Sequence, residues 1–147
     1  MRRLLVIEDG TEYCEFAQLF LDGEFEIAAA QSAAEALSSL ANRPFDAFLI
    51  DLRFDRARPE SLVGDLEASA RRLFSGDRDR ALRHLQDQQG VLILAALRAA
   101  GHAQPAVFVH EFPARRLQNL RKLYGEVRTV PNFDARALRL VLAGGDA

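Results

Sequence analysis

Short apolar runs alternate along this chain with segments of helical periodicity. Five runs have the length of buried strands, at residues 4–7, 25–30, 45–52, 106–109 and 126–130. Between them, apolar residues recur at the i, i+3, i+4, i+7 spacing of an amphipathic helix, as in Tyr13, Phe16, Ala17, Phe20 and Leu21. The alternation predicts an α/β fold, in which a doubly wound parallel sheet of five strands carries helices on both faces.

Capping residues set the expected helix boundaries. Ser32-Ala33-Ala34-Glu35 matches a capping box, and Asp134 suits the N-cap of the last helix. Pro113 suits the first position of the helix before it. A helical pattern that begins at Arg78 can continue to Ala100, although a glycine at position 90 weakens it locally.

The regular alternation breaks between residues 55 and 88. This stretch holds seven Arg and seven Asp or Glu, so 14 of its 34 residues are charged, compared with 27% in the whole chain. We therefore predict a single domain over residues 1–147 with a charged helical insertion at about 55–88, after the third strand. The insertion is either a solvated, salt-bridged excursion or a partner-binding surface that emerges close to the end of that strand.

Composition narrows the class of protein. Nineteen Lys and Arg against 21 Asp and Glu give a formal charge of −2, and this balance provides no electrostatic reason to expect nucleic acid as a partner. A single cysteine excludes an internal disulfide framework and a cysteine-rich metal site. No apolar stretch approaches the ~18 residues of a membrane span, and the N-terminus lacks the pattern of an export signal. We expect a cytoplasmic protein with no membrane partner.

Acidic residues follow two of the predicted strands. Glu8 and Asp9 come directly after the first strand, and Asp51 ends the third. Ligands of open parallel sheets bind at the carboxyl ends of the strands, so neighbouring strands would bring three carboxylates together. Their repulsion raises at least one pKa unless a cation is present, and Mg²⁺ prefers such oxygen ligands. An Asp at such a metal site can attack a phosphoryl group. The alternative to a functional site is that these three acids are solvated loop residues.

The order and spacing of these motifs resemble the receiver domain of bacterial two-component response regulators. The resemblance covers roughly residues 3–143 apart from the insertion. The motifs that carry it are Leu4-Leu5-Val6-Ile7-Glu8-Asp9, Phe48-Leu49-Ile50-Asp51-Leu52, the helix that includes residues 90–98, the strand at 105–109 and Val130-Pro131. It implies that Asp51 accepts a phosphoryl group from a histidine kinase. It also implies that Asp9 and Asp51 bind Mg²⁺ through their carboxylates, Glu8 through water, and Arg53 through its backbone carbonyl.

Three switch positions depart from the pattern of that family. Val130 stands where the family has a lysine, His110 where it has Ser or Thr, and Val127 where it has an aromatic residue. Loss of a charge-assisted contact costs ~1.5–3 kcal/mol, which is roughly 10- to 150-fold in a rate. Without a differential contact, phosphorylation cannot favour one conformation. We therefore expect an atypical receiver or pseudo-receiver in which phosphorylation of Asp51 is weak or absent.

We expect a stand-alone signalling protein that acts by protein–protein interaction and is not an enzyme. Its expected partner is a histidine kinase or another signalling protein. A homodimer, in which a second copy of the chain is the partner, is a further possibility.

The alternative function is that of a Mg²⁺-dependent phosphohydrolase with Asp51 as the nucleophile. Phosphohydrolases of the haloacid-dehalogenase type carry a second Asp two residues later, and this chain has Arg53 there. A flavodoxin-like nucleotide binder would need a Gly-rich phosphate loop, which the sequence lacks.

Overall fold

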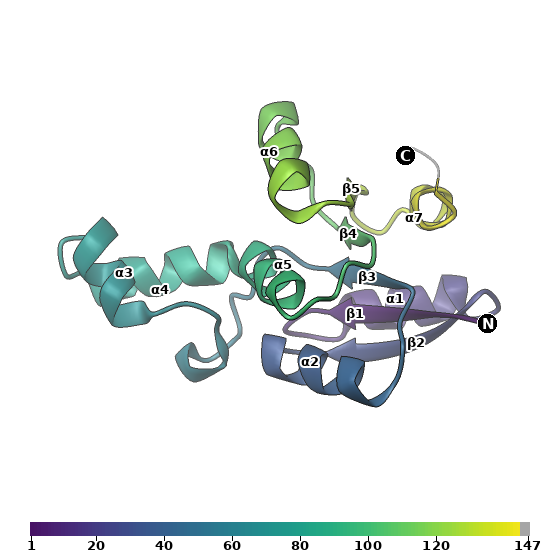
Figure 1. Cartoon of the computed structure of the whole chain (residues 1–147), viewed down its shortest axis with the longest axis horizontal. Coiled ribbons are helices and arrows are strands. Elements are labelled where there is room, and N and C mark those ends of the chain that lie inside the picture. The colour runs from purple at the N-terminus through teal and green to yellow at the C-terminus, as the bar shows by residue number, and fades with distance from the viewer. Residues whose placement is uncertain (145–147) are drawn as a thin grey trace.

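The core of the molecule is a five-stranded, all-parallel sheet in the order β2-β1-β3-β4-β5 (Figure 1). A computed structural model of the chain describes residues 1–144. The strands are β1 (Arg2–Ile7), β2 (Phe25–Ala30), β3 (Ala47–Ile50), β4 (Ala106–Phe108) and β5 (Val127–Thr129). Each of the five apolar runs therefore contains a strand, and the predicted doubly wound fold is confirmed.

Seven α-helices and one short 3₁₀ helix accompany the sheet in the described residues. They are α1 (Glu12–Leu21), α2 (Ala33–Asn42), η1 (Pro59–Ser61), α3 (Leu66–Leu73), α4 (Arg78–Asp87), α5 (Gln89–Ala99), α6 (Ala114–Tyr124) and α7 (Ala135–Leu142). None of these helices is both long and apolar enough to cross a membrane.

The side chains of each strand alternate between two cores. In β1, Leu4 and Val6 pack with residues of α1 and α7, whereas Leu5 and Ile7 pack with residues of α2, α5 and α6. All four side chains are fully buried. Strands covered on both faces are apolar throughout, and full burial of one such side chain contributes about 1.5–3 kcal/mol.

The predicted N-caps are present. The Ser32 hydroxyl accepts a hydrogen bond from the backbone N–H of Glu35 at 3.1 Å, and Asp134 accepts one from Ala137 at 2.9 Å. These bonds satisfy amides that the first turn of a helix leaves free. Pro113 lies one position earlier than predicted, at the N-cap of α6.

The helical pattern predicted from Arg78 to Ala100 is interrupted. It forms two helices, α4 and α5, which meet at Gln88. Just after this junction, the backbone N–H of Gly90 donates to the carbonyl of Leu52 at 2.8 Å. This contact ties the start of α5 to the segment that leaves β3.

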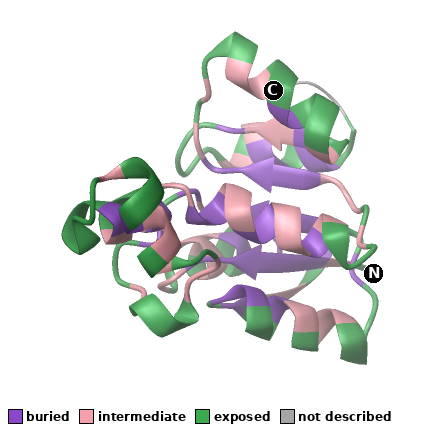
Figure 2. Ribbon diagram, turned by 60° about the vertical axis from the view of Figure 1, so that its left-hand side comes forward, coloured by how far each residue is buried: buried purple, intermediate pink, exposed green. Residues whose placement is uncertain are grey.

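The segment from η1 to α4 extends away from the sheet (Figures 1 and 2), and we call residues 55–88 the excursion. Its helices α3 and α4 pack on each other, with Ala70, Ala81 and Leu85 buried. Most of its other residues are exposed or half-buried. The fully buried Gln89 side chain fastens the excursion to α5, because its oxygen accepts from Val63 N–H at 2.7 Å and its amide donates to the Val63 carbonyl at 3.2 Å.

Candidate functional site at the acidic edge

The carboxyl ends of β1 and β3 lie side by side. Ile7 is the register partner of Ile50, and the backbone N–H of Asp51 donates to the carbonyl of Ile7 at 3.0 Å. Glu8, Asp9 and Asp51 follow these strand ends directly, and we call these three residues the acidic edge. The structure thus brings together the three carboxylates that the sequence analysis singled out.

Burial and the neighbouring acids make ionisation of Asp51 less favourable than it is in water. Burial raises the pKa of this half-buried carboxyl to about 6, and the negative charges of Asp9 and Glu8 add to the effect. Backbone hydrogen bonds from Arg53 and Leu52 act in the opposite direction. A carboxylate in such surroundings is stabilised by any positive charge that reaches it.

The carboxylate of Glu8 accepts hydrogen bonds from the first turn of α1. Its side chain is buried, and its two oxygens accept hydrogen bonds from the backbone N–H groups of Tyr13 at 3.0 Å and Cys14 at 2.8 Å. Thr11, the N-cap residue, makes no side-chain cap bond, so Glu8 takes over this role. Burial raises the pKa of Glu8 above its usual value.

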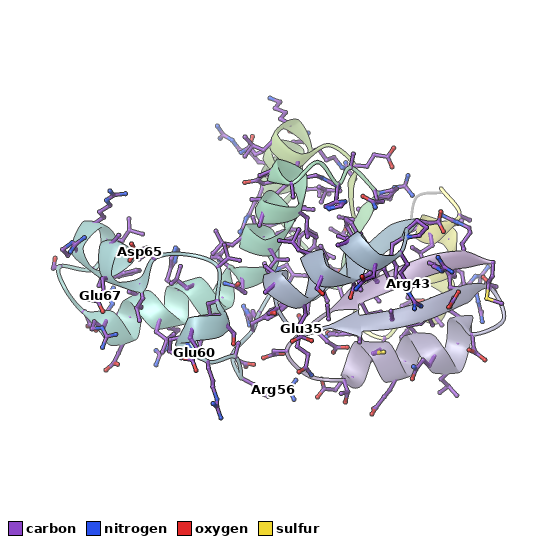
Figure 3. All side chains as sticks on the ribbon, turned by 60° about the horizontal axis from the view of Figure 1, so that its bottom comes forward. Glu35, Arg43, Arg56, Glu60, Asp65 and Glu67 are labelled. Atoms are coloured by element: carbon purple, nitrogen blue, oxygen red, sulfur yellow. The ribbon has the colours of Figure 1, made fainter. Side chains whose placement is uncertain are left out.

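The side chain of Asp9 contacts Arg56. Arg56 lies near the start of the excursion (Figure 3). One carboxylate oxygen accepts from the backbone N–H of Arg56 at 2.8 Å, and the other lies 3.6 Å from its guanidinium. The same guanidinium binds both oxygens of Glu12, at 2.8 and 2.9 Å. Hydrogen bonding to Arg56 lowers the pKa of Glu12 to about 2.

The residues proposed as Mg²⁺ ligands do not fit a metal ion as they are arranged here. Within residues 1–144, no three side chains of His, Cys, Asp or Glu form a group that could hold one. Both oxygens of Glu8 accept from α1 amides, and both oxygens of Asp9 face Arg56. The backbone amide of Arg53 donates a hydrogen bond to the Asp51 carboxyl group.

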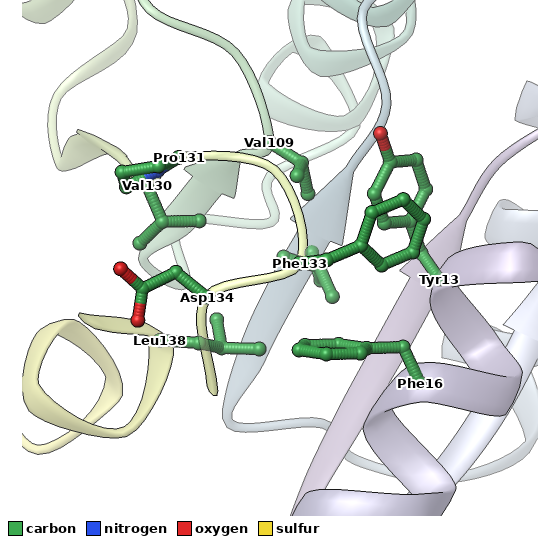
Figure 4. A pocket seen from close by; sticks show the side chains of 9 residues that line it. Tyr13, Phe16, Val109, Val130, Pro131, Phe133, Asp134 and Leu138 are labelled. Carbon is green, nitrogen blue, oxygen red and sulfur yellow. The ribbon is translucent and has the colours of Figure 1, made fainter. Parts of the chain in front are cut away.

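Val130 lies in an apolar pocket between α1 and α7 (Figure 4). The side chain is buried and lines this pocket with Val109, Leu138 and residues of α1. Phe133, at a positive φ of 52°, stacks on Tyr13 with ring centroids 5.1 Å apart. Val130 therefore packs against hydrocarbon and brings no charge to the acidic edge.

His110 and Val127, the other two positions that the sequence analysis compared with the receiver pattern, also pack against apolar side chains. His110 packs its ring edge-on against Phe112, with centroids 4.8 Å apart. Burial lowers the pKa of His110, and the charges of Arg53 and Arg116 lower it further, so the ring is neutral near pH 7. Val127 is buried in the core that contains residues of α5 and α6.

Two features of the site were missed in the sequence analysis. Arg56 was counted only as one of seven arginines in a charged stretch, and no motif marks it. The sequence pattern marks Gly90 as a weak point in a helix and as part of the resemblance, but it does not predict that Gly90 lies against the backbone of Asp51 and Leu52. A glycine inside an otherwise strong helical pattern was the available signal for this close approach.

Part of the sequence of this chain is similar to a known protein. No protein-family model matches the chain. A curated response regulator receiver protein of Anaeromyxobacter sp. (strain Fw109-5) is 36% identical over 67 residues, which are 45% of this chain and 28% of that protein. The chain thus matches well under two thirds of the length of this relative.

Solved structures are similar over nearly the whole chain. The chemotaxis protein CheY4 of Vibrio cholerae has a TM-score of 0.64 at 15% identity, with 97% of each chain covered. A sensor protein of Polaromonas sp. JS666 has a TM-score of 0.63 at 23% identity, covering 97% of this chain and 93% of that one. The receiver domain of the Francisella response regulator 1452 has a TM-score of 0.61 at 14% identity, covering 97% and 94%. These similarities confirm the receiver-type fold.

Proposed function

We propose that this chain, a receiver-type domain by its fold and by its similarity to a response regulator receiver protein, acts in signal transduction by binding another signalling protein. Asp51 is its phosphoryl acceptor, and phosphorylation is weak. The observation that carries the proposal is the parallel register of β1 and β3, which brings Asp9 and Asp51 to one edge of the sheet.

The bonds that change in the acceptor chemistry belong to the Asp51 carboxylate and the phosphodonor. One carboxylate oxygen forms a bond to phosphorus while the bond between phosphorus and the leaving atom of the donor breaks, which gives an acyl phosphate. The ionised carboxylate is the nucleophile. Because the pKa of Asp51 is raised to about 6, most of it is ionised at pH 7 and above.

Weak phosphorylation follows from the charges around the acceptor. Phosphorylated Asp51 carries about two negative charges at pH 7, one more than its free carboxylate, at an edge that also holds Glu8 and Asp9. Val130 provides neither a charge nor a hydrogen-bond donor, and the neutral ring of His110 packs against Phe112. Because no group at these positions responds to a phosphoryl group, we infer that partner binding depends little on phosphorylation.

Intact-mass measurement tests the acceptor. The protein is incubated with Mg²⁺ and a small phosphodonor, beside the variants Asp51→Asn and Asp55→Asn. We expect a slowly accumulating adduct of one phosphoryl group in the wild type and in Asp55→Asn, in which an exposed Asp four residues away is changed. Asp51→Asn should give none, because an amide does not accept the group.

Two outcomes would contradict this assignment. An adduct that persists in Asp51→Asn would place the acceptor elsewhere. Steady turnover of a phosphate ester, lost in Asp51→Asn, would instead identify the phosphohydrolase that shares the same nucleophile.

A further inference from the structure

The cation at the acidic edge comes from the chain itself. We propose that Arg56 is the resident cation of this edge and excludes a divalent metal ion by occupying Asp9. The inference concerns the same edge as the proposed function but does not depend on phosphoryl transfer, because it is tested by metal binding alone.

Arg56 joins Asp9, in the loop between β1 and α1, to Glu12, the first residue of α1. Its backbone N–H donates to Asp9, and its guanidinium lies 3.6 Å from the other oxygen of that side chain. The guanidinium also makes two parallel hydrogen bonds to Glu12, at 2.8 and 2.9 Å. Such bidentate pairs fix the geometry of both partners more tightly than a single contact does.

Burial makes this contact important for Asp9. The Asp9 side chain is only 3% exposed, so its charge has lost most of its hydration. A buried carboxylate without a partner is strongly unfavourable. Arg56 supplies both a hydrogen bond and a positive charge, whereas its own side chain is 57% exposed and keeps much of its contact with water.

Gly10 provides the space that the arginine occupies. A Cβ atom at this position would collide with Nη2 of Arg56 and lie 2.5 Å from Oε2 of Glu12. The loop that connects the acidic edge to α1 is therefore shaped around the guanidinium. A side chain at position 10 would force Arg56 out of its place.

A metal ion competes with this arrangement. Mg²⁺ requires several oxygen ligands in a near-octahedral shell and gives up its waters reluctantly. A metal ion on Oδ1 of Asp9 would lie beside the guanidinium of Arg56, which is 3.6 Å from that oxygen, and the two positive charges would repel each other. Oδ2 of Asp9 already accepts from the Arg56 backbone N–H, and the oxygens of Glu8 accept from amides of α1. Because Arg56 begins the excursion, its contact with Asp9 also fixes the base of that segment against the sheet.

Mg²⁺ titration of the whole chain tests the proposal. Binding is followed by the amide NMR signals of residues 8–10 and 51–53, in the wild type and in Arg56→Gln. We expect Arg56→Gln to bind Mg²⁺ at least about 10-fold more tightly, since loss of a charge-assisted contact has an effect of this size. Millimolar Mg²⁺ should also raise the melting temperature of Arg56→Gln, with little effect on the wild type.

Arg58→Gln is the matched control. Arg58 is exposed, belongs to the same loop, and makes no ion pair with any residue from 1 to 144. Its variant should bind Mg²⁺ as weakly as the wild type, because it changes the net charge equally without touching Asp9. Equal Mg²⁺ affinities of wild type and Arg56→Gln, or no binding by either, would overturn the proposal.

Discussion

Replacement of Gly90 by alanine is expected to lower the free energy of unfolding by about 3 kcal/mol, at the upper end of the usual cost of overpacking. An added Cβ atom would overlap the carbonyl oxygen of Asp51 and lie 2.8 Å from Cα of Leu52. Both are backbone atoms that follow directly on β3, so they cannot rotate away as a side chain would. The hydrogen bond from Gly90 N–H to the Leu52 carbonyl would be disturbed by the same shift.

Thermal and urea unfolding measure this effect. For a chain of this size, 3 kcal/mol corresponds to a loss of about 10 °C in melting temperature. Gly23→Ala is the control, because nothing lies within 4 Å of its added Cβ. We expect Gly23→Ala to remain within about 0.5 kcal/mol of the wild type. If Gly90→Ala is as stable as Gly23→Ala, the start of α5 does not lie against the end of β3 as described.

Introduction of a lysine at position 130 is expected to speed phosphorylation of Asp51 by roughly 10- to 150-fold, the reverse of the loss estimated for a missing charge-assisted contact. Val130 shares its pocket with Tyr13, whose pKa is raised to about 12 by burial and by the charge of Asp51. A lysine stem can pack along this apolar pocket while its ammonium group reaches toward the acidic edge. There it would offset the negative charge of the incoming phosphoryl group.

The rate of adduct formation with a small phosphodonor measures this gain. Val130→Met is the control, because methionine has a similar length without the ammonium group. Both variants should keep the far-ultraviolet circular dichroism spectrum of the wild type. If the lysine variant reacts no faster than the methionine variant, the absence of charge at position 130 does not limit the chemistry.

The sequence pattern predicted the sheet well because strands buried on both faces carry a strong local signal. Leu4 to Ile7 and Ala47 to Ile50 are uninterrupted apolar runs, and both form strands. The acids of the candidate site follow these runs directly, so their meeting at one edge required only that β1 and β3 be neighbours. Sequence periodicity does not encode this neighbour relation, which the resemblance to receiver domains supplied.

The contacts of the acidic edge depended on tertiary structure and could not be predicted. Asp9 and Arg56 are 47 positions apart, and the path of the excursion decides which of its arginines reaches the edge. The sequence predicts Glu8 as an acid of the site, but it does not predict that both oxygens of Glu8 accept from α1 amides, at a helix start where Thr11 makes no side-chain cap bond. The boundary between α4 and α5 lies at Gln88, two residues before Gly90, which contacts the backbone of Asp51 and Leu52 just after β3.

The close approach of the acids at the ends of β1 and β3 is tested most directly by a carbon-13 NMR titration of the Asp51 carboxyl group. Folding raises the pKa of this group from 3.8 to about 6, so the folded protein binds the proton more tightly than the unfolded chain does. Ionisation of Asp51 therefore costs folding stability, and this cost appears as the pH rises from about 4 to 6. We predict a midpoint near pH 6 in the wild type and a lower one in Asp9→Asn, which removes the neighbouring charge. A midpoint near 3.8 that is unchanged by Asp9→Asn would show that Asp51 is solvated and apart from Asp9, and would contradict the account.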